Sequence, residues 1–230
     1  MCMAVAILFF PAFSFGQKAV VDGVVYSLSI YSQDATIYSR IDNQLPDTLI
    51  IPKSIEYQGS EYVVRSDLYP AFKQAKMKVL IWEADCSIKE KNFYNCPNLT
   101  TIIIKGQVED IENEAFSYCT NLEKITFNEG LTYIGRAAFE GCSSIKEITV
   151  PASVTMIDVR AFSECSSLKK VVIKNKNLEN EVNRYTNMLF KNTPFAQVKA
   201  QQPAGKRKPN QAVTNDSRFK VNKKTGVVVY

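Results

Sequence analysis

Four cysteines stand at equal intervals along the chain, and their thiols are the groups whose spacing first suggests chemistry. They are Cys96, Cys119, Cys142 and Cys165, each 23 residues after the one before. Thiols at regular intervals could bind a metal ion or form disulfides. A zinc site usually combines a C-x-x-C pair with histidine, and the chain has neither beside these cysteines. We therefore expect no metal site.

Disulfides between these cysteines are also unfavourable. An interval of 23 residues is the interval of a repeat, and side chains at equivalent positions of stacked units point the same way, which suits a bridge poorly. Cysteine in such a position behaves as a small buried apolar residue. We expect free thiols with a packing role. Of the other two cysteines, Cys2 lies near the start and Cys86 is isolated.

The absence of histidine bears on catalysis as well. Histidine is the side chain best suited to proton transfer near neutrality and the commonest metal ligand. Carboxylate-based chemistry stays open, but we expect no enzymatic activity and no cofactor.

The cysteines belong to a repeated unit of 23 residues. Each unit opens with isoleucine, has phenylalanine five positions later and cysteine three after that, and then a leucine or isoleucine and two apolar residues two apart. The openings are Ile88, Ile111, Ile134 and Ile157; the phenylalanines are Phe93, Phe116, Phe139 and Phe162. A fixed period between 20 and 50 residues marks a solenoid, whose units must stack to bury their apolar faces.

The second unit carries two recognisable segments. Leu122-x-x-Ile125-x-Phe127 has the strand signature of leucine-rich repeats, and Ala115-Phe116-x-x-Cys119 fits a short helix-like turn opposite it. The whole unit closely resembles the BspA-like leucine-rich repeats, over roughly residues 45–200. The resemblance implies an α/β fold: a right-handed leucine-rich-repeat solenoid with a parallel β-sheet, short helical turns and a β-hairpin N-terminal cap. It implies no particular ligand.

The chain divides into four segments. Residues 1–16 are uncharged and apolar, too short for a membrane span, with small Ser14 and Gly16 before a possible cut at Gln17. This predicts a signal peptide and export; a buried N-terminal strand or helix is the alternative. Residues 17–66 form an N-terminal β cap with half a repeat, 67–200 the solenoid with its C-terminal cap, and 201–230 a basic linker and terminal hairpin.

Within the cap, Asp22-Gly23 predicts one hairpin turn, and Gly59 predicts a second between Tyr57 and Val64. Further apolar patterns indicate that incomplete copies of the repeat precede the complete ones. These are the half repeat 49–55, a degenerate Ala-Phe-x-x-Ala copy at 71–75, and Ile81, which we place where Ile102 falls.

At the C-terminal end the 23-residue spacing is lost after Ile173. Leu189 to Thr193 resembles the Phe-x-x-Cys turn, with Thr193 in place of cysteine, and about five residues are inserted within 175–185. Terminal repeats are often atypical because one face meets water.

The net charge of +5 belongs to the tail. From Lys199 onward stand eight basic residues and one acid, Asp216, so the preceding part has a net charge of −2. We interpret the stretch to Asp216 as a solvated linker and Phe219 to Tyr230 as hairpin-like. Binding of phosphate-bearing polymers is the alternative, but no aromatic residue interleaves 206–208, and we expect no nucleic acid partner.

Side chains between the core positions of the predicted strands face outward and are the candidate binding residues. They are Thr101, Ile103, Lys105, Lys124, Thr126, Asn128, Glu147, Thr149, Lys170, Val172 and Lys174. The alternative is a solvated face, since threonine and valine are good strand residues and Lys124 could simply neutralise Glu147. Aromatic candidates near the N-terminal end are Trp82, Tyr57, Tyr62, Tyr69 and Tyr94.

BspA-like relatives include bacterial surface proteins implicated in adhesion, and the resemblance implies a similar role. We expect an exported, non-catalytic binding module for protein or glycan contact, secreted or held at the cell envelope, without a membrane span in the mature chain. The alternative is a structural envelope or periplasmic component without a dedicated ligand. The sequence does not identify the ligand, the anchoring or the oligomeric state.

Overall fold

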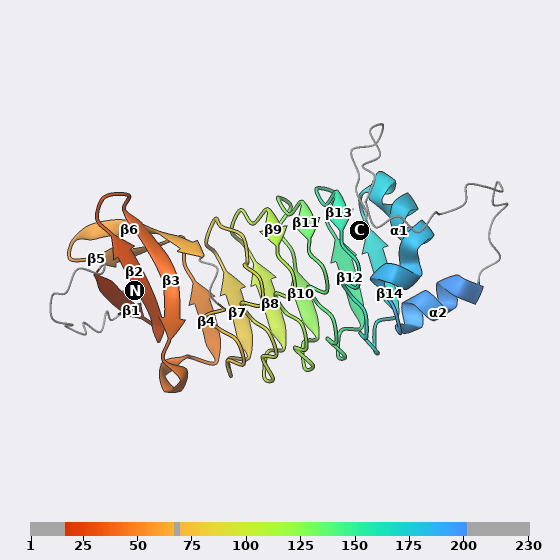
Figure 1. Cartoon of the computed structure of the whole chain (residues 1–230), viewed down its shortest axis with the longest axis horizontal. Coiled ribbons are helices and arrows are strands. Elements are labelled where there is room, and N and C mark those ends of the chain that lie inside the picture. Colours follow the sequence, from red (N-terminus) through yellow and green to blue (C-terminus); the bar gives the residue numbers. More distant parts are fainter. Residues whose placement is uncertain (1–16, 67–69, 202–230) are drawn as a thin grey trace, which may run out of the picture.

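The computed structural model describes residues 17–66 and 70–201, which form an elongated stack of strands between a separate sheet at one end and two helices at the other (Figure 1). The predicted signal peptide, and the terminal hairpin with nearly all of the basic linker, lie outside the described residues.

A five-stranded sheet forms the N-terminal end. Its order is β1-β2-β3-β6-β5, with β3 and β6 parallel and the other neighbours antiparallel. Asp22 and Gly23 have positive φ values of 48° and 76°, which makes the tight turn between β1 and β2. Both predicted hairpins are present. The strands are β1 (Lys18–Val21), β2 (Val24–Ser29), β3 (Asp34–Arg40), β5 (Ser54–Tyr57) and β6 (Ser60–Ser66), and a short 3-10 helix spans Asp42–Gln44.

The stack itself is built from parallel strands, one from each unit (Figure 1). On one side lie the four strands β10-β8-β7-β4 and then the pair β12-β14, and we call the two parts together the main sheet. A second, narrow ladder, β13-β11-β9, follows the sheet. The strands are β4 (Thr48–Ile51), β7 (Val79–Trp82), β8 (Thr101–Ile104), β10 (Lys124–Thr126), β12 (Glu147–Val150), β14 (Lys170–Ile173), β9 (Asp110–Ile111), β11 (Tyr133–Ile134) and β13 (Met156–Ile157).

The main sheet is interrupted between β10 and β12. Within the described residues no ladder of hydrogen bonds joins these two strands, whereas the narrow ladder β13-β11-β9 continues past the same point. The core-facing Ile125 on β10 is accordingly only half-buried, while its counterparts Ile102 and Ile148 are 0% and 3% exposed.

The predicted position of Ile81 is wrong by one residue. In the structure Leu80 is paired with Ile102, and Ile81 with Ile103. Leu80 and Trp82 are fully buried, so this register places the largest side chain of β7 in the core and leaves Ile81 on the outer face. A one-residue shift exchanges the two faces of a strand.

Stacked phenylalanines run through the core. Six rings follow one another with centroids 5.0–5.5 Å apart and planes within 7° of parallel. All six are fully buried. They are Phe72, Phe93, Phe116, Phe139, Phe162 and Phe190, so the predicted repeat positions and both degenerate end copies share one column.

The cysteines form a second column beside the rings. Each thiol donates a hydrogen bond to the backbone carbonyl of a phenylalanine in the preceding unit, for example Cys119 to Phe93 at 3.1 Å and Cys165 to Phe139 at 3.2 Å. The five cysteines in the described part of the chain are free, as expected. Cys2 lies outside it.

The Ala-Phe-x-x-Cys segments are chains of turns rather than helices. Two positions of each unit have positive φ, as at Glu114 (55°) and Tyr118 (61°). A left-handed residue interrupts the right-handed α conformation, so no helix can extend through these segments.

The predicted insertion lies within helix α1 (Lys176–Leu189), which Asn175 caps by accepting from the amides of Asn177 and Leu178. Phe190 then rejoins the ring column, and Thr193, fully buried, takes the place of cysteine. Its hydroxyl donates to the Phe190 carbonyl at 2.8 Å. Helix α2 (Pro194–Gln201) follows.

Candidate functional site on the outer face of the main sheet

The candidate binding residues lie in columns because the strands are parallel and in register. Thr101 is paired with Lys124, and Glu147 with Lys170, so these four outward positions follow one another across the strands. A second column contains Ile103 beside Thr126, and Thr149 beside Val172. The interruption between β10 and β12 divides both columns.

The candidates differ in exposure. Lys105, Lys124, Thr126, Glu147, Thr149, Lys170, Val172 and Lys174 are exposed, whereas Thr101, Ile103 and Asn128 are half-buried. Exposure is therefore greatest from β10 to β14.

Three of the exposed lysines already have acidic partners. Lys105 pairs with Glu83 at 3.0 Å, Lys170 with Glu147 at 3.0 Å, and Lys174 with Glu129 at 2.7 Å. The alternative in which Glu147 neutralises Lys124 does not hold, because Glu147 is paired with Lys170 on the opposite side. In the part of the chain that the structure describes, Lys124 makes no ion pair, so its charge is available to a ligand.

Asn128 has a structural contact. Its amide nitrogen donates to the backbone carbonyl of Val108 at 3.0 Å, one unit earlier. The half-buried side chain thus links two neighbouring units, and less of it is exposed on the outer face than its place in the column suggests.

The structure adds two strands that the candidate set omitted. Ile50 on β4 and Ile81 on β7 are in register with Ile103 on β8, and all three side chains are half-buried on the outer face. The middle column of the face is therefore apolar on β4, β7 and β8, has threonine on β10 and β12, and ends with the exposed Val172 on β14. In both strands an uninterrupted apolar run, Leu49–Ile51 in β4 and Val79–Trp82 in β7, leaves the outward residue without a polar marker.

The aromatic alternatives that the structure describes are not on this face. Trp82 is fully buried and Tyr62 is 6% exposed, so both belong to the core. Tyr57 is half-buried; Tyr94 is half-buried and its ring meets Tyr118 edge-on at 5.5 Å. Tyr69 lies outside the described residues.

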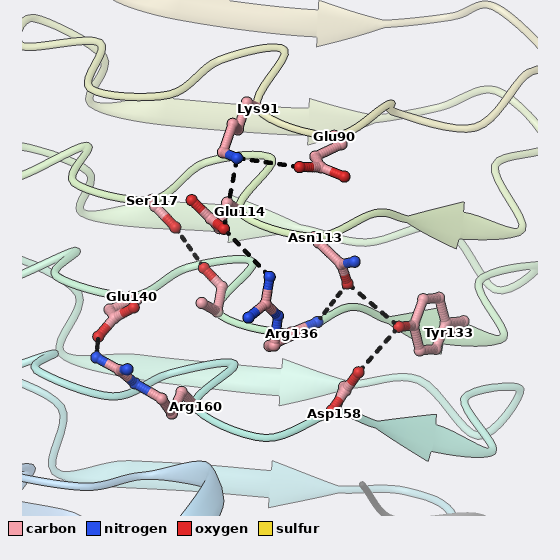
Figure 2. A network of polar contacts seen from close by, with 11 residues as sticks. Glu90, Lys91, Asn113, Glu114, Ser117, Tyr133, Arg136, Glu140, Asp158 and Arg160 are labelled. Atoms are coloured by element: carbon pink, nitrogen blue, oxygen red, sulfur yellow. Dashed lines mark hydrogen bonds and ion pairs between the residues drawn. The ribbon is translucent and has the colours of Figure 1, made fainter. Parts of the chain in front are cut away.

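A second polar surface lies on the turns, away from the main sheet, and was not predicted. Figure 2 shows side chains of successive turns reaching toward one another. Glu114 lies between two cations, 3.7 Å from Lys91 and 3.5 Å from Arg136. The Tyr133 hydroxyl lies 3.2 Å from Asp158 and 3.4 Å from Asn113.

One pair of this network is partly buried. The Glu140 side chain is 7% exposed and is paired with Arg160, which is 56% exposed. The Glu140 carboxylate also raises the pKa of the nearby Tyr118 hydroxyl. Each of these charged groups has a partner on the next unit, so we interpret the network as a set of contacts between repeats rather than a reactive site.

The described residues were also compared with the requirements of a metal site and of a membrane-spanning helix, and they meet neither. The described residues contain no group of three or more His, Cys, Asp or Glu side chains arranged to hold a metal ion. None of the helices between residues 17 and 201 combines the length and apolar character that crossing a bilayer requires.

Comparison with solved structures identifies the same architecture. A leucine-rich repeat protein from Bacteroides ovatus is 32% identical, with a TM-score of 0.58, over 66% of this chain and 40% of its own. The chain thus spans about two fifths of that relative. The T. pallidum leucine-rich repeat protein (17% identity, TM-score 0.53) is matched over 78% of this chain and 99% of its own. The pneumococcal vaccine antigen PcpA (20% identity, TM-score 0.53) is matched over 79% of this chain and 49% of its own.

No curated protein sequence matches the chain significantly. The sequence pattern of the BspA type leucine rich repeat region matches residues 86–207 in six copies, which is more than half of the chain. The matched residues include the stacked units that begin at Ile88, and residues 202–207 lie outside the described part of the chain. The chain therefore belongs to the BspA-type leucine-rich repeat family.

Proposed function

We propose that the protein is an exported, non-catalytic binding module that presents the outer face of its main sheet to a protein or glycan. Export rests on the apolar residues 1–16, and a surface role on resemblance to BspA-like proteins. One of the similar structures is a pneumococcal vaccine antigen, which agrees with a role outside the cell.

The observation that carries the proposal is the free polar group at the centre of the exposed columns. Lys124 is exposed and has no ion pair within the described residues, and its neighbour Thr126, two residues along β10, is exposed as well. The charges of the turn network, by contrast, are paired with neighbouring repeats. A ligand can therefore engage Lys124 without first breaking an interaction of the fold.

A charge-reversal experiment tests the use of this face. The purified chain is applied to arrays of glycans and of extracellular proteins, and Lys124→Glu with Thr126→Arg is compared with the unchanged protein. Both side chains point to solvent, so we expect unchanged thermal unfolding and at least about tenfold weaker binding, which corresponds to ~1.4 kcal/mol.

The matched control makes the same changes of charge on the turn side. Lys191→Glu with Ser166→Arg alters two exposed residues away from the sheet and should leave binding intact. If the control variant loses binding and the sheet variant keeps it, the binding site lies on the turns. If no array component binds at all, the structural envelope role is favoured instead. Fractionation of native cells with surface proteolysis tests export separately.

A further inference from the structure

Most cations in the described part of the chain have a partner within the fold. Acidic side chains, usually on a neighbouring unit, pair with them, and two lysines lie over tyrosine rings. The exposed lysines that make neither contact among the described residues are Lys76, Lys124, Lys146, Lys169 and Lys191. Three of these belong to consecutive units of the solenoid.

These three residues, Lys124, Lys146 and Lys169, lie where three strands of the main sheet begin, and we call them the lysine row. Lys124 is the first residue of β10, and the other two immediately precede β12 and β14. Because the strands are parallel, their first residues follow one rim of the main sheet (Figure 1). The row therefore extends the free charge of Lys124 beyond the candidate residues of the outer face.

An ion pair elsewhere on the same rim shows that side chains at this position reach the neighbouring unit. Lys78 and Asp47 immediately precede β7 and β4, and their charged groups lie 2.8 Å apart. The Lys78 amide also donates to the Asp47 carbonyl at 2.8 Å. The Lys169 amide donates to the Lys146 carbonyl in the same way, at 2.9 Å. These two side chains carry like charges, which repel, so the fold gains no ion pair where it could have one.

Acidic side chains near the row do not neutralise it. Glu147 is paired with Lys170 at 3.0 Å. Glu123, which precedes Lys124, is exposed and makes no ion pair within residues 17–66 and 70–201. With Lys170 included, the strand starts carry four lysines and two glutamates, an excess of two positive charges. Such a surface attracts an acidic ligand.

The surroundings of the row favour a polysaccharide over an acidic protein. The core of a protein interface is rich in apolar and aromatic side chains and poor in lysine. Among the described residues, β10 and β12 have no exposed large hydrophobic side chain, and β14 has only Val172. The strand starts thus offer charge without an apolar surface for a protein to cover.

The same segments disfavour a nucleic acid, because single strands bind by stacking their bases on aromatic rings. No aromatic residue occurs in 121–126, 143–150 or 166–173. Successive units are stacked at the ring spacing of 5.3 Å found between Phe139 and Phe162. A linear polymer with acidic groups at regular intervals can therefore contact one unit after another.

We propose that the lysine row binds an anionic polysaccharide, whose carboxylate or sulfate groups engage Lys124, Lys146 and Lys169. The ammonium groups donate charge-assisted hydrogen bonds to these oxygens. The inference rests on the proposed binding function of the main sheet and specifies the chemical class of its ligand.

Binding of two acidic polymers to the full chain tests the proposal. Polygalacturonate carries carboxylates, dextran sulfate carries sulfates, and unmodified dextran is the neutral polymer; biolayer interferometry measures each. In Lys146→Glu with Lys169→Glu we expect at least about tenfold weaker binding of the acidic polymer and a shallower salt dependence, because fewer charged contacts remain. A like-charged pair replaces a like-charged pair, so thermal unfolding should not change. Lys146→Arg with Lys169→Arg should retain binding.

The matched control is Lys206→Glu with Lys208→Glu, which makes the same change of charge in the basic tail and should weaken binding less. Equal weakening in the two variants would show that binding follows net charge alone and would overturn the proposal. Dextran binding as tightly as the acidic polymers would also overturn it. So would polyglutamate or single-stranded DNA binding as tightly as polygalacturonate, because the row would then accept any acidic polymer.

A separate comparison distinguishes this inference from the proposed function. If neither acidic polysaccharide binds, but Lys124→Glu with Thr126→Arg still weakens binding of an array component, the outer face binds a ligand of another class and only the present inference fails. If that variant also leaves all binding unchanged, the proposed function of the main sheet fails with it.

Discussion

The thiol of Cys142 donates a hydrogen bond to the backbone carbonyl of Phe116 at a distance of 3.2 Å. The same contact recurs at Cys96, Cys119 and Cys165, always from one unit to the preceding one. A small apolar side chain that can still donate is what this position needs, because the carbonyl it meets is buried among aromatic rings. This explains why a thiol recurs here without any disulfide.

Replacing Cys142 by alanine should therefore lower the free energy of unfolding by about 1–3 kcal/mol. The change leaves the Phe116 carbonyl without its donor and opens a small cavity. Cys142→Ser retains a donor and separates the two contributions. Urea denaturation measures both variants. A Cys142→Ala protein as stable as the original would show that the contact has no energetic value.

Stability should fall at alkaline pH. Burial raises the pKa of Cys165 from 9.0 to about 12 and also raises that of Cys142. Above pH 9 the unfolded chain loses these protons while the folded chain keeps them, so each thiol lowers the free energy of unfolding by ~1.4 kcal/mol per pH unit. The loss continues until the folded-state pKa is reached.

Cys165→Ala isolates the contribution of one thiol. Between about pH 9 and pH 12, the pKa range of this thiol, the slope of unfolding free energy against pH should become less steep by up to ~1.4 kcal/mol per unit. Identical slopes in the two proteins would mean that Cys165 ionises equally in both states.

Phe139→Ala should destabilise the protein by about 3–5 kcal/mol. Its ring lies 5.3 Å from both Phe116 and Phe162 and meets Phe127 edge-on, so the cavity would touch three units. Faster amide exchange should extend to the neighbouring repeats, since each repeat is stabilised by its neighbours. Lys124→Glu on the outer face is the control. Wild-type melting of the Phe139 variant would exclude this ring from the core.

Gly106→Ala should cost more than Gly59→Ala. A Cβ at Gly106 would lie 2.1 Å from the Ala84 carbonyl oxygen, a backbone atom that cannot move aside, whereas at Gly59 nothing lies within 4 Å. Gly59 has φ +77°, so alanine there costs about 1–2 kcal/mol in backbone strain alone. We expect Gly106→Ala to exceed this value in thermal and urea unfolding. The reverse order would show that the units can separate locally.

The periodic parts of the fold could be predicted because each unit buries the same apolar positions. Phe116 and Cys119 recur in phase, and the strand signature around Ile125 follows them, so the stacked core and its parallel strands are legible in the sequence. The helix α1 was recognisable only as an insertion, because its sequence has no counterpart in the other units. The register of β7 was misjudged since the run Val79–Trp82 has no polar residue to mark the outer face.

The outer face was less predictable than the core. The columns follow from strand alternation, but the ion-pair partners depend on side-chain conformation, so the sequence does not tell whether Glu147 is paired with Lys124 or, as in the structure, with Lys170. The two extra strands β4 and β7 extend the face with Ile50 and Ile81. The turn network around Glu114 has no repeated residue type along the units, so no periodic signal revealed it.

The interruption between β10 and β12 makes the stiffness of the molecule unequal on its two sides. Along the narrow ladder β9-β11-β13 the hydrogen bonds run on without a break, while the main sheet loses its own bonds at that point. Flexing there stretches no hydrogen bond of the main sheet. The solenoid should therefore bend most easily at this joint, about the intact ladder as its hinge line, so that the spacing between Lys124 and Glu147 adjusts to the curvature of whatever the protein touches.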